Sequence, residues 1–159
     1  MSGTAGAGET EGDAVGMRVA VVQATFHAHI TDGLANGALA AIAAHGADAS
    51  LVKVPGAFEL PLAAKRLAQT GHDAVVAVGA VIEGETDHYE HIAHRASEGL
   101  MAVMLETGVP IGFGLLTVRQ EAHAVARSGP GAANKGAEAA DAAVRSALVL
   151  RDLEVPGPR

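Results

Sequence analysis

The chemically most suggestive part of the sequence is residues 79–91, which read GAVIEGETDHYEH. An apolar run ends here, Gly84 permits a turn, and a segment with helical spacing opens at His88. Where a strand leads through a turn into a helix, unpaired backbone N–H groups and the positive end of the helix dipole attract an anion. An imidazole beside that anion can accept or return a proton near neutral pH. These residues therefore predict an anion site with a group for proton transfer.

Aromatic and acidic side chains fall in other segments that we interpret as strand ends. All three phenylalanines of the chain, Phe26, Phe58 and Phe113, lie in such segments, and Glu59 follows Phe58. In open α/β sheets, ligands bind at the carboxyl ends of the strands. The rings therefore suggest a flat ligand held by stacking. Each phenylalanine could equally be an ordinary core residue.

The elements that would position these residues alternate between strand and helix. Apolar, β-rich runs predict strands at residues 18–24, 49–54, 73–82 and 111–117. Helical spacing predicts helices that start near residue 30 and stop at Gly46, and at residues 60–68, 88–107, 120–127 and about 134–150. Uninterrupted apolar strands are typical of a parallel sheet that is covered on both faces. The predicted class is α/β, with a four-stranded parallel sheet between two helical layers.

Composition limits the class of protein further. At 159 residues the chain should form one domain, and its net charge of −7 argues against nucleic acid or an anionic membrane as a partner. No segment approaches the roughly 20 apolar residues of a membrane span. The sequence has no cysteine, which excludes disulfides and fits a cytoplasmic protein.

The two ends of the sequence differ in composition from its centre. Residues 1–16 are small or acidic and lack the basic start and apolar centre of a signal peptide. We expect a flexible arm at residues 1–16, one domain at residues 17–151 and a flexible tail at residues 152–159, where two prolines disfavour a helix.

Five motifs, in order and spacing, resemble the 6,7-dimethyl-8-ribityllumazine synthase family. They are VPGAFELP at 54–61, GAVI-x-G-x-T-x-HY at 79–89, LETGVP at 105–110, FG-x-LT at 113–117 and NKG-x-EAA at 134–140. The resemblance covers residues 18–150. It implies a flavodoxin-like three-layer α/β/α sandwich and the penultimate step of riboflavin synthesis. In that step 5-amino-6-(D-ribitylamino)uracil condenses with 3,4-dihydroxy-2-butanone 4-phosphate, releasing phosphate and water, without a metal or an organic cofactor.

The resemblance also implies a role for each candidate residue. Phe26 would stack on the pyrimidine, and the other contacts on the pyrimidine and ribityl side would come from Ala57, Phe58, Glu59, Ala80, Val81 and Ile82. The phosphate would be held by the backbone N–H groups of Glu85 and Thr86, the Thr86 hydroxyl and Arg127, with Lys135 nearby. His88 would be the acid and base of the reaction. Phe113 would come from a neighbouring subunit, so the site would require a homo-oligomer, either a pentamer or a 60-subunit shell.

The sequence departs from the family at several of these positions. Family members usually carry Arg at position 83 and Asn at position 27, whereas this chain has Glu83 and His27. Together with Glu85 and Asp87, Glu83 places three acids around the implied phosphate site. This leaves open an alternative function, in which a catalytically weakened member binds flavin or lumazine or forms a shell.

Simpler structural interpretations also stay open for individual residues. Thr31 and Asp32 could cap the first helix, and Thr86 or Asp87, with Glu90, could form a capping box. Arg127 could be a cation that the dipole favours at a helix C-terminus, and Lys135 could satisfy nearby carbonyls. His88, His91 and His94 lie close to one helical stripe, but we interpret the last two as surface residues rather than metal ligands. His45, His72 and His123 are interpreted as solvated.

Overall fold

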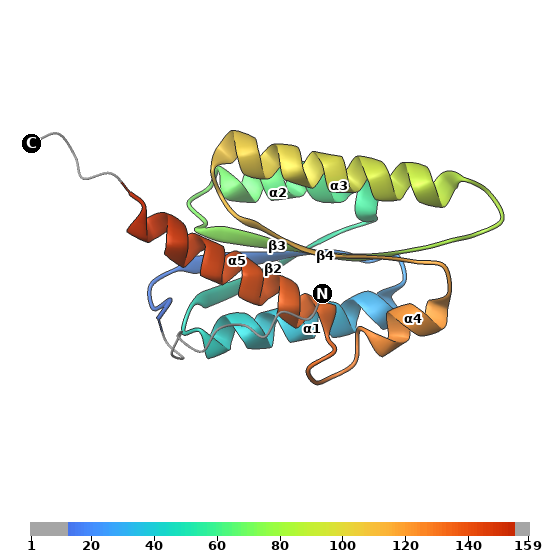
Figure 1. The fold of residues 1–159 in the computed structure, drawn as a ribbon, viewed down its shortest axis with the longest axis horizontal. Helices are drawn as coiled ribbons and strands as arrows, with labels where there is room; N and C mark the ends of the chain where they lie inside the picture. Colours follow the sequence, from blue (N-terminus) through green and yellow to red (C-terminus); the bar gives the residue numbers. More distant parts are fainter. Residues whose placement is uncertain (1–12, 155–159) are drawn as a thin grey trace, which may run out of the picture.

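The computed structural model describes residues 13–154 and forms three layers (Figure 1). The central sheet is parallel and contains β1 (Arg18–Ala24), β2 (Asp48–Val54), β3 (Ala74–Ile82) and β4 (Ile111–Val118) in the order β2-β1-β3-β4. Helices α1 (Ala28–Ala44) and α5 (Lys135–Asp152) cover one face, and α2 (Leu60–Ala68) and α3 (His88–Thr107) cover the other. The short η1 (Ala57–Glu59) precedes α2, and α4 (Glu121–Ala126) follows β4. The predicted flavodoxin-like sandwich is confirmed.

The sheet is buried on both faces along its two central strands. Alternate residues of β1 and β3 enter two separate cores, with Val21 and Val76 facing α1 and α5, and Val22 and Val75 facing α2 and α3. This explains why these strands read as continuous apolar runs, since both faces are removed from water. At the sheet edge, β2 stays exposed from Asp48 to Lys53.

The start of α1 differs from the prediction. The helix begins at Ala28, two residues earlier than expected, after His27 in the left-handed backbone conformation. Thr31 and Asp32 therefore lie inside the helix and do not cap it. Their side chains accept hydrogen bonds from the buried amide of Gln23, at 3.0 and 2.7 Å. A buried amide must be hydrogen-bonded, and this need decides the role of both residues.

The start of α3 was predicted at the right residue, and Asp87 lies at the N-cap as one of the two predicted candidates, but the capping box does not form. Asp87 is the N-cap residue, but its side chain makes no capping bond and instead lies 3.3 Å from Nε2 of His91. The hydroxyl of Thr86 accepts a long bond of 3.4 Å from the N–H of His88. The helix ends at Gly108, whose φ of 70° suits glycine as a helix terminator.

Helices α1 and α5 pack closely because glycines line their contact. A Cβ atom at Gly33 would overlap the backbone oxygen of Ser128, and one at Gly136 would overlap the backbone oxygen of Leu34. Asn134 completes this contact from the N-cap of α5. Its side-chain oxygen accepts from the N–H of Ala137, and its amide donates to the carbonyls of Gly33, Ser128 and Gly129. One buried side chain therefore connects both helices and the loop before α5.

The ends of the described chain extend the predicted domain slightly. Ala14 is buried, and its N–H donates to the carbonyl of His45, so packing begins before Met17. The rest of the predicted arm, residues 1–12, and most of the tail, residues 155–159, lie outside the described residues. None of the helices in residues 13–154 combines the length and apolarity needed to cross a membrane.

The ring of His45 is mostly buried, contrary to the prediction that this residue is solvated. Its Nε2 lies 2.8 Å from a carboxylate oxygen of Asp141, which connects the end of α1 to α5. The ring of His72 also has a hydrogen-bond partner, since its Nδ1 lies 2.8 Å from the carbonyl oxygen of Leu67.

Replacing Gly136 with alanine should destabilise the fold. The new methyl group would overlap the Leu34 backbone, which cannot move without separating α1 from α5. We expect the free energy of unfolding to fall by at least about 1 to 3 kcal/mol, the usual cost of overpacking. Urea denaturation would measure the change. Gly129→Ala is the control, since a Cβ there meets nothing within 4 Å; equal stability of the two variants would contradict the tight contact.

Candidate functional site

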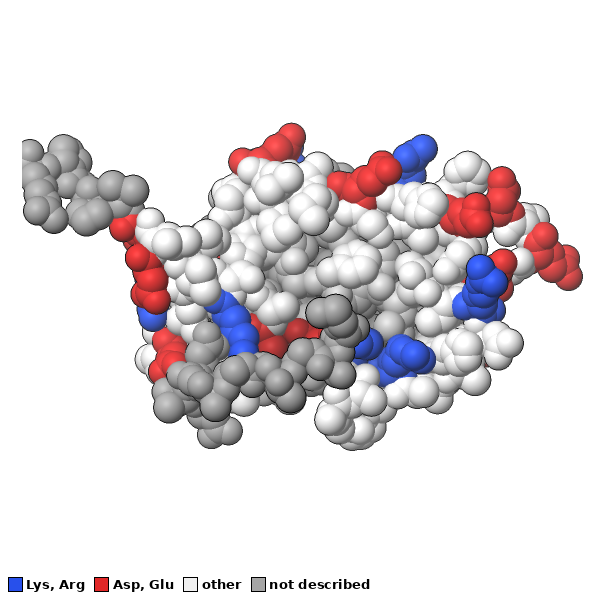
Figure 2. Space-filling view, in the orientation of Figure 1, with Lys and Arg blue, Asp and Glu red and all other residues white. Residues whose placement is uncertain are grey.

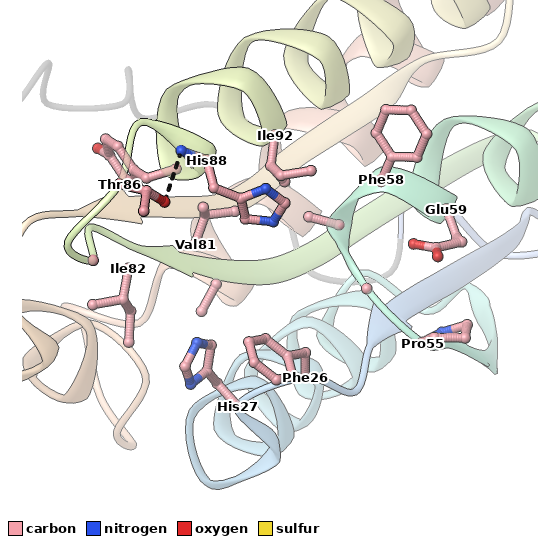
Figure 3. Close-up of a pocket in the computed structure, with 15 residues that line it drawn as sticks. Phe26, His27, Pro55, Phe58, Glu59, Val81, Ile82, Thr86, His88 and Ile92 are labelled. Atoms are coloured by element: carbon pink, nitrogen blue, oxygen red, sulfur yellow. Dashed lines mark hydrogen bonds between the residues drawn. The ribbon is translucent and has the colours of Figure 1, made fainter.

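A cavity of about 420 Å³ opens at the carboxyl ends of β1, β2 and β3. Its volume is in the range of small-molecule sites. Nine of the predicted site residues line it (Figure 3): Phe26, Ala57, Phe58, Glu59, Ala80, Val81, Ile82, Thr86 and His88. The structure thus brings together residues from three strand ends and the start of α3, far apart in the sequence.

The strand order explains why the cavity lies here. From β1 the chain passes to α1 on one face of the sheet, whereas from β3 it passes to α3 on the other face (Figure 1). Adjacent strands whose connections leave in opposite directions form a crevice between the two loops. This crevice separates Phe26, after β1, from His88, at the start of α3.

Two exposed phenylalanine rings stand at this cavity. The exposed fractions of Phe26 and Phe58 are 69% and 62%, so neither ring belongs to the core. The Phe26 backbone is held in place because its N–H donates to the carbonyl of Pro55, which continues the pairing of β1 with β2. Exposed rings on a held backbone offer apolar surface to a flat ligand.

The carboxylate of Glu59 projects from η1 in the same region (Figure 3). An ionised carboxylate accepts several strong hydrogen bonds, which suits a ligand with hydroxyl groups. The floor of the cavity is the end of β3, where Ala80 and Val81 are buried and Ile82 is partly buried.

His88 is the first residue of α3, and its ring lies beside Val81 and Ile92 (Figure 3). The side chain is exposed, and no hydrogen bond to its ring occurs within residues 13–154. The ring is therefore available to a ligand in the cavity. The sequence-based prediction that this helix starts at His88 is therefore confirmed.

The loop between β3 and α3 carries the three acids noted in the sequence. Gly84 and Thr86 line the cavity, but Glu85 does not. A carboxylate oxygen of Glu83 lies 3.6 Å from Nε of Arg119, which follows β4. A carboxylate oxygen of Asp87 lies 3.3 Å from Nε2 of His91. Two of the acids thus have partners of their own. Among the described residues, no group of three or more His, Cys, Asp or Glu side chains is arranged to hold a metal ion.

His27 also lines the cavity, and the sequence analysis left its role open. Partial burial lowers the pKa of His27 below the usual value for histidine. The nearby His29 lowers this pKa further, whereas Glu121 acts in the opposite direction. The signal that could have identified His27 is its place between the end of a strand and the first turn of a helix.

Phe113, Arg127 and Lys135 lie outside the cavity. Phe113 is the third residue of β4 and is in register with Ala77 in the middle of β3, so its prediction as a strand-end residue was wrong. Arg127 donates from Nη1 to the carbonyl of His123 at 2.8 Å, as expected of a cation at the end of α4. Nζ of Lys135 pairs with Glu138 at 2.8 Å. One chain therefore assembles nine of the predicted site residues and leaves these three elsewhere.

Comparison with known proteins identifies the family. The family model for 6,7-dimethyl-8-ribityllumazine synthase matches residues 16–151. Similar proteins named 6,7-dimethyl-8-ribityllumazine synthase include one from Kineococcus radiotolerans, 52% identical, with 95% of each chain covered. Another, from Leifsonia xyli subsp. xyli, is 46% identical over 96% of this chain and 99% of its own. A third, from Streptomyces coelicolor, is 46% identical over 88% of this chain and 89% of its own. The chain therefore belongs to the 6,7-dimethyl-8-ribityllumazine synthase family.

Proposed function

We propose that this chain condenses 5-amino-6-(D-ribitylamino)uracil with 3,4-dihydroxy-2-butanone 4-phosphate to 6,7-dimethyl-8-ribityllumazine, with release of phosphate and water. The observation that carries the proposal is one cavity in which exposed aromatic rings, a carboxylate and a histidine at a helix N-terminus meet. Each of these groups suits one part of the two substrates. The whole sequence lacks cysteine, which supports a cytoplasmic location for this reaction.

The pyrimidine would bind on the aromatic side of the cavity. Its ring stacks against Phe26, next to Ala57 and Phe58, and the end of β3 at Ala80, Val81 and Ile82 borders the ring. Glu59 accepts hydrogen bonds from the ribityl hydroxyls. Stacking on an exposed ring removes apolar surface of both partners from water, which supports binding without a charged contact.

The phosphate would bind at the start of α3, where the backbone N–H groups of Glu85 and Thr86 are not used within the helix. The Thr86 hydroxyl adds a polar contact. The side chain of Glu85 can face solvent while its N–H binds, since this residue is exposed and does not line the cavity.

His88 would transfer protons between the two substrates. The amine of the pyrimidine adds to the ketone, and the carbinolamine loses water to form an imine. A base then removes a proton from carbon as the C–O bond to phosphate breaks and phosphate leaves. His88 stands between the aromatic side and the phosphate loop, where it serves these steps in turn. A positioned base is worth roughly 100- to 10,000-fold in rate.

The complete site would require a second copy of the chain. Phe113, Arg127 and Lys135 lie outside the cavity of their own chain, so they would serve the cavity of a neighbour. The chain also exposes apolar side chains on α3, β4 and α5: Met101, Leu105, Phe113, Val149 and Leu150. Figure 2 shows that the centre of the face over these elements is free of charged side chains. Such a patch supports a protein–protein interface, here in a homo-oligomer that is a pentamer or a 60-subunit shell.

The His88→Ala variant should form lumazine at least about 100-fold more slowly than the parent protein, because proton transfer loses its base. Lumazine fluorescence and phosphate release, followed together with both substrates, measure the rate. A protein-free mixture corrects for the unaided reaction, and His94→Ala serves as a control on an exposed face of the same helix. A His88→Ala variant as fast as the parent would remove His88 from the reaction. A parent protein with no activity would instead favour a flavin-binding or shell-forming member of the family.

Arg127→Ala should raise the Michaelis constant for the butanone phosphate and leave that for the pyrimidine nearly unchanged. The loss corresponds to about 1.5 to 3 kcal/mol, typical of a hydrogen bond between charged groups. Steady-state kinetics with each substrate varied in turn would separate the two constants. Arg151→Ala, at the far end of α5, is the matched control. An unchanged constant for the butanone phosphate would place Arg127 outside the site.

Sizing of the purified protein should give a mass several times the 15.9 kDa of one chain. If His88 and Arg127 of different copies form one site, a mixed assembly of His88→Ala and Arg127→Ala chains should, at a low concentration of the butanone phosphate, be more active than the average of the two variants alone, because some sites receive both intact residues. Refolding the two variants together, against each refolded separately, provides the comparison. A monomer, or mixed assemblies with no recovery, would contradict a shared site.

A further inference from the structure

We propose that His27 is a second imidazole of the cavity, one that hydrogen-bonds the polar edge of the pyrimidine while the ring is stacked on Phe26. This inference rests on the proposed function. It gives a role to His27, which is not part of the five family motifs and is distinct from the proton-transfer residue His88. In this role His27 positions the substrate and takes no part in the proton transfers assigned to His88.

The backbone of His27 is the first observation. Its φ of 63° and ψ of 47° place it in the left-handed region, and among the described residues it is the one non-glycine residue with a positive φ. Histidine adopts this conformation at a cost, which surrounding contacts must offset. Here the His27 carbonyl accepts from the N–H groups of Ile30 and Thr31, at 2.8 and 3.0 Å, and so starts α1. Strain held in place at the edge of a cavity points to a function for the side chain.

The direction of the ring is the second observation. The His27 ring lies beside that of Phe26, with centroids 4.4 Å apart and planes tilted by 57°, and it lines the cavity near Ile82 (Figure 3). A pyrimidine stacked on Phe26 would therefore bring an edge towards the imidazole. That edge carries N–H and carbonyl groups, and an imidazole in its neutral form offers one donor and one acceptor.

The surroundings of His27, burial first, favour the neutral form of its ring. Partial burial and His29 on α1 lower its pKa, against the opposing effect of Glu121 on α4. Glu121 is itself paired with His29. From the other elements of the cavity, Glu59 of η1 and His88 and Tyr89 of α3 are the titratable groups that share it. A lowered pKa keeps the neutral form down to a pH below the usual histidine value of about 6.5. When the pH falls below the lowered pKa of His27, protonation of the ring removes its hydrogen-bond acceptor and weakens pyrimidine binding.

Two substitutions test this role without disturbing the backbone. His27→Gly removes the imidazole at a position where glycine suits the left-handed conformation. His27→Asn also tolerates this conformation and keeps a donor and an acceptor, but it does not titrate. His94→Gln removes an exposed histidine of α3 that does not line the cavity and serves as the control.

The measurements are the Michaelis constants for both substrates from pH 5 to 8, and direct titration of the ribitylaminouracil. We expect His27→Gly to raise the constant for the pyrimidine about 2- to 13-fold, the range of one lost hydrogen bond, and to change kcat and the constant for the butanone phosphate less. In the parent protein and in His94→Gln, the pyrimidine constant should rise as the pH falls below about 6.5. In His27→Asn, that part of the pH dependence should be lost.

Opposite outcomes would separate this inference from the proposed function. If the parent binds the pyrimidine and forms lumazine, but His27→Gly leaves the pyrimidine constant unchanged, the role of His27 is wrong and the enzymatic function stands. The same holds if His27→Asn keeps the full acid dependence. If the parent neither binds the pyrimidine nor forms lumazine, the proposed function and the role of His27 both fall.

Discussion

The site depends on one topological constraint, the opposite directions in which the chain leaves β1 and β3. These strands are neighbours in the order β2-β1-β3-β4, but their helices cover different faces of the sheet. Because the two connections leave in opposite directions, a crevice forms between the loops at this point. Phe26 and His27 border it from one side, and Thr86 and His88 from the other.

Close packing on the α1–α5 face keeps this arrangement in place. Gly33 and Gly136 allow backbone atoms of the two helices and the loop before α5 to meet, and Asn134 satisfies three carbonyls there. On the same face, the buried amide of Gln23 connects β1 to the first turns of α1. These contacts hold α1 against the sheet and α5, directly after Phe26 and His27. The exposed rings of the site are therefore attached to a closely packed interior, whose side chains have little freedom to shift.

The distribution of the site residues also bears on assembly. Nine predicted residues share one cavity, whereas Phe113, Arg127 and Lys135 lie on β4, after α4 and at the start of α5. Exposed apolar residues on α3, β4 and α5 accompany Phe113. A single interface that covers this apolar surface would also carry the three residues towards another copy.

The sequence by itself determined the fold class, the order of the elements and most of the predicted residues that line the cavity. Continuous apolar runs predicted both central strands, because strands buried on two faces need apolar residues throughout. The start of α3 at His88 and its end at Gly108 could also be read directly, since the turn before the helix and the terminating glycine are local signals. Only the tertiary structure decided the roles of Thr31 and Asp32, the burial of His45 and the position of Phe113 within β4. Each depends on a partner distant in sequence or on strand register: Gln23 for the first pair, Asp141 for His45 and Ala77 for Phe113. Local patterns specify how a segment folds, but not which distant group a side chain meets.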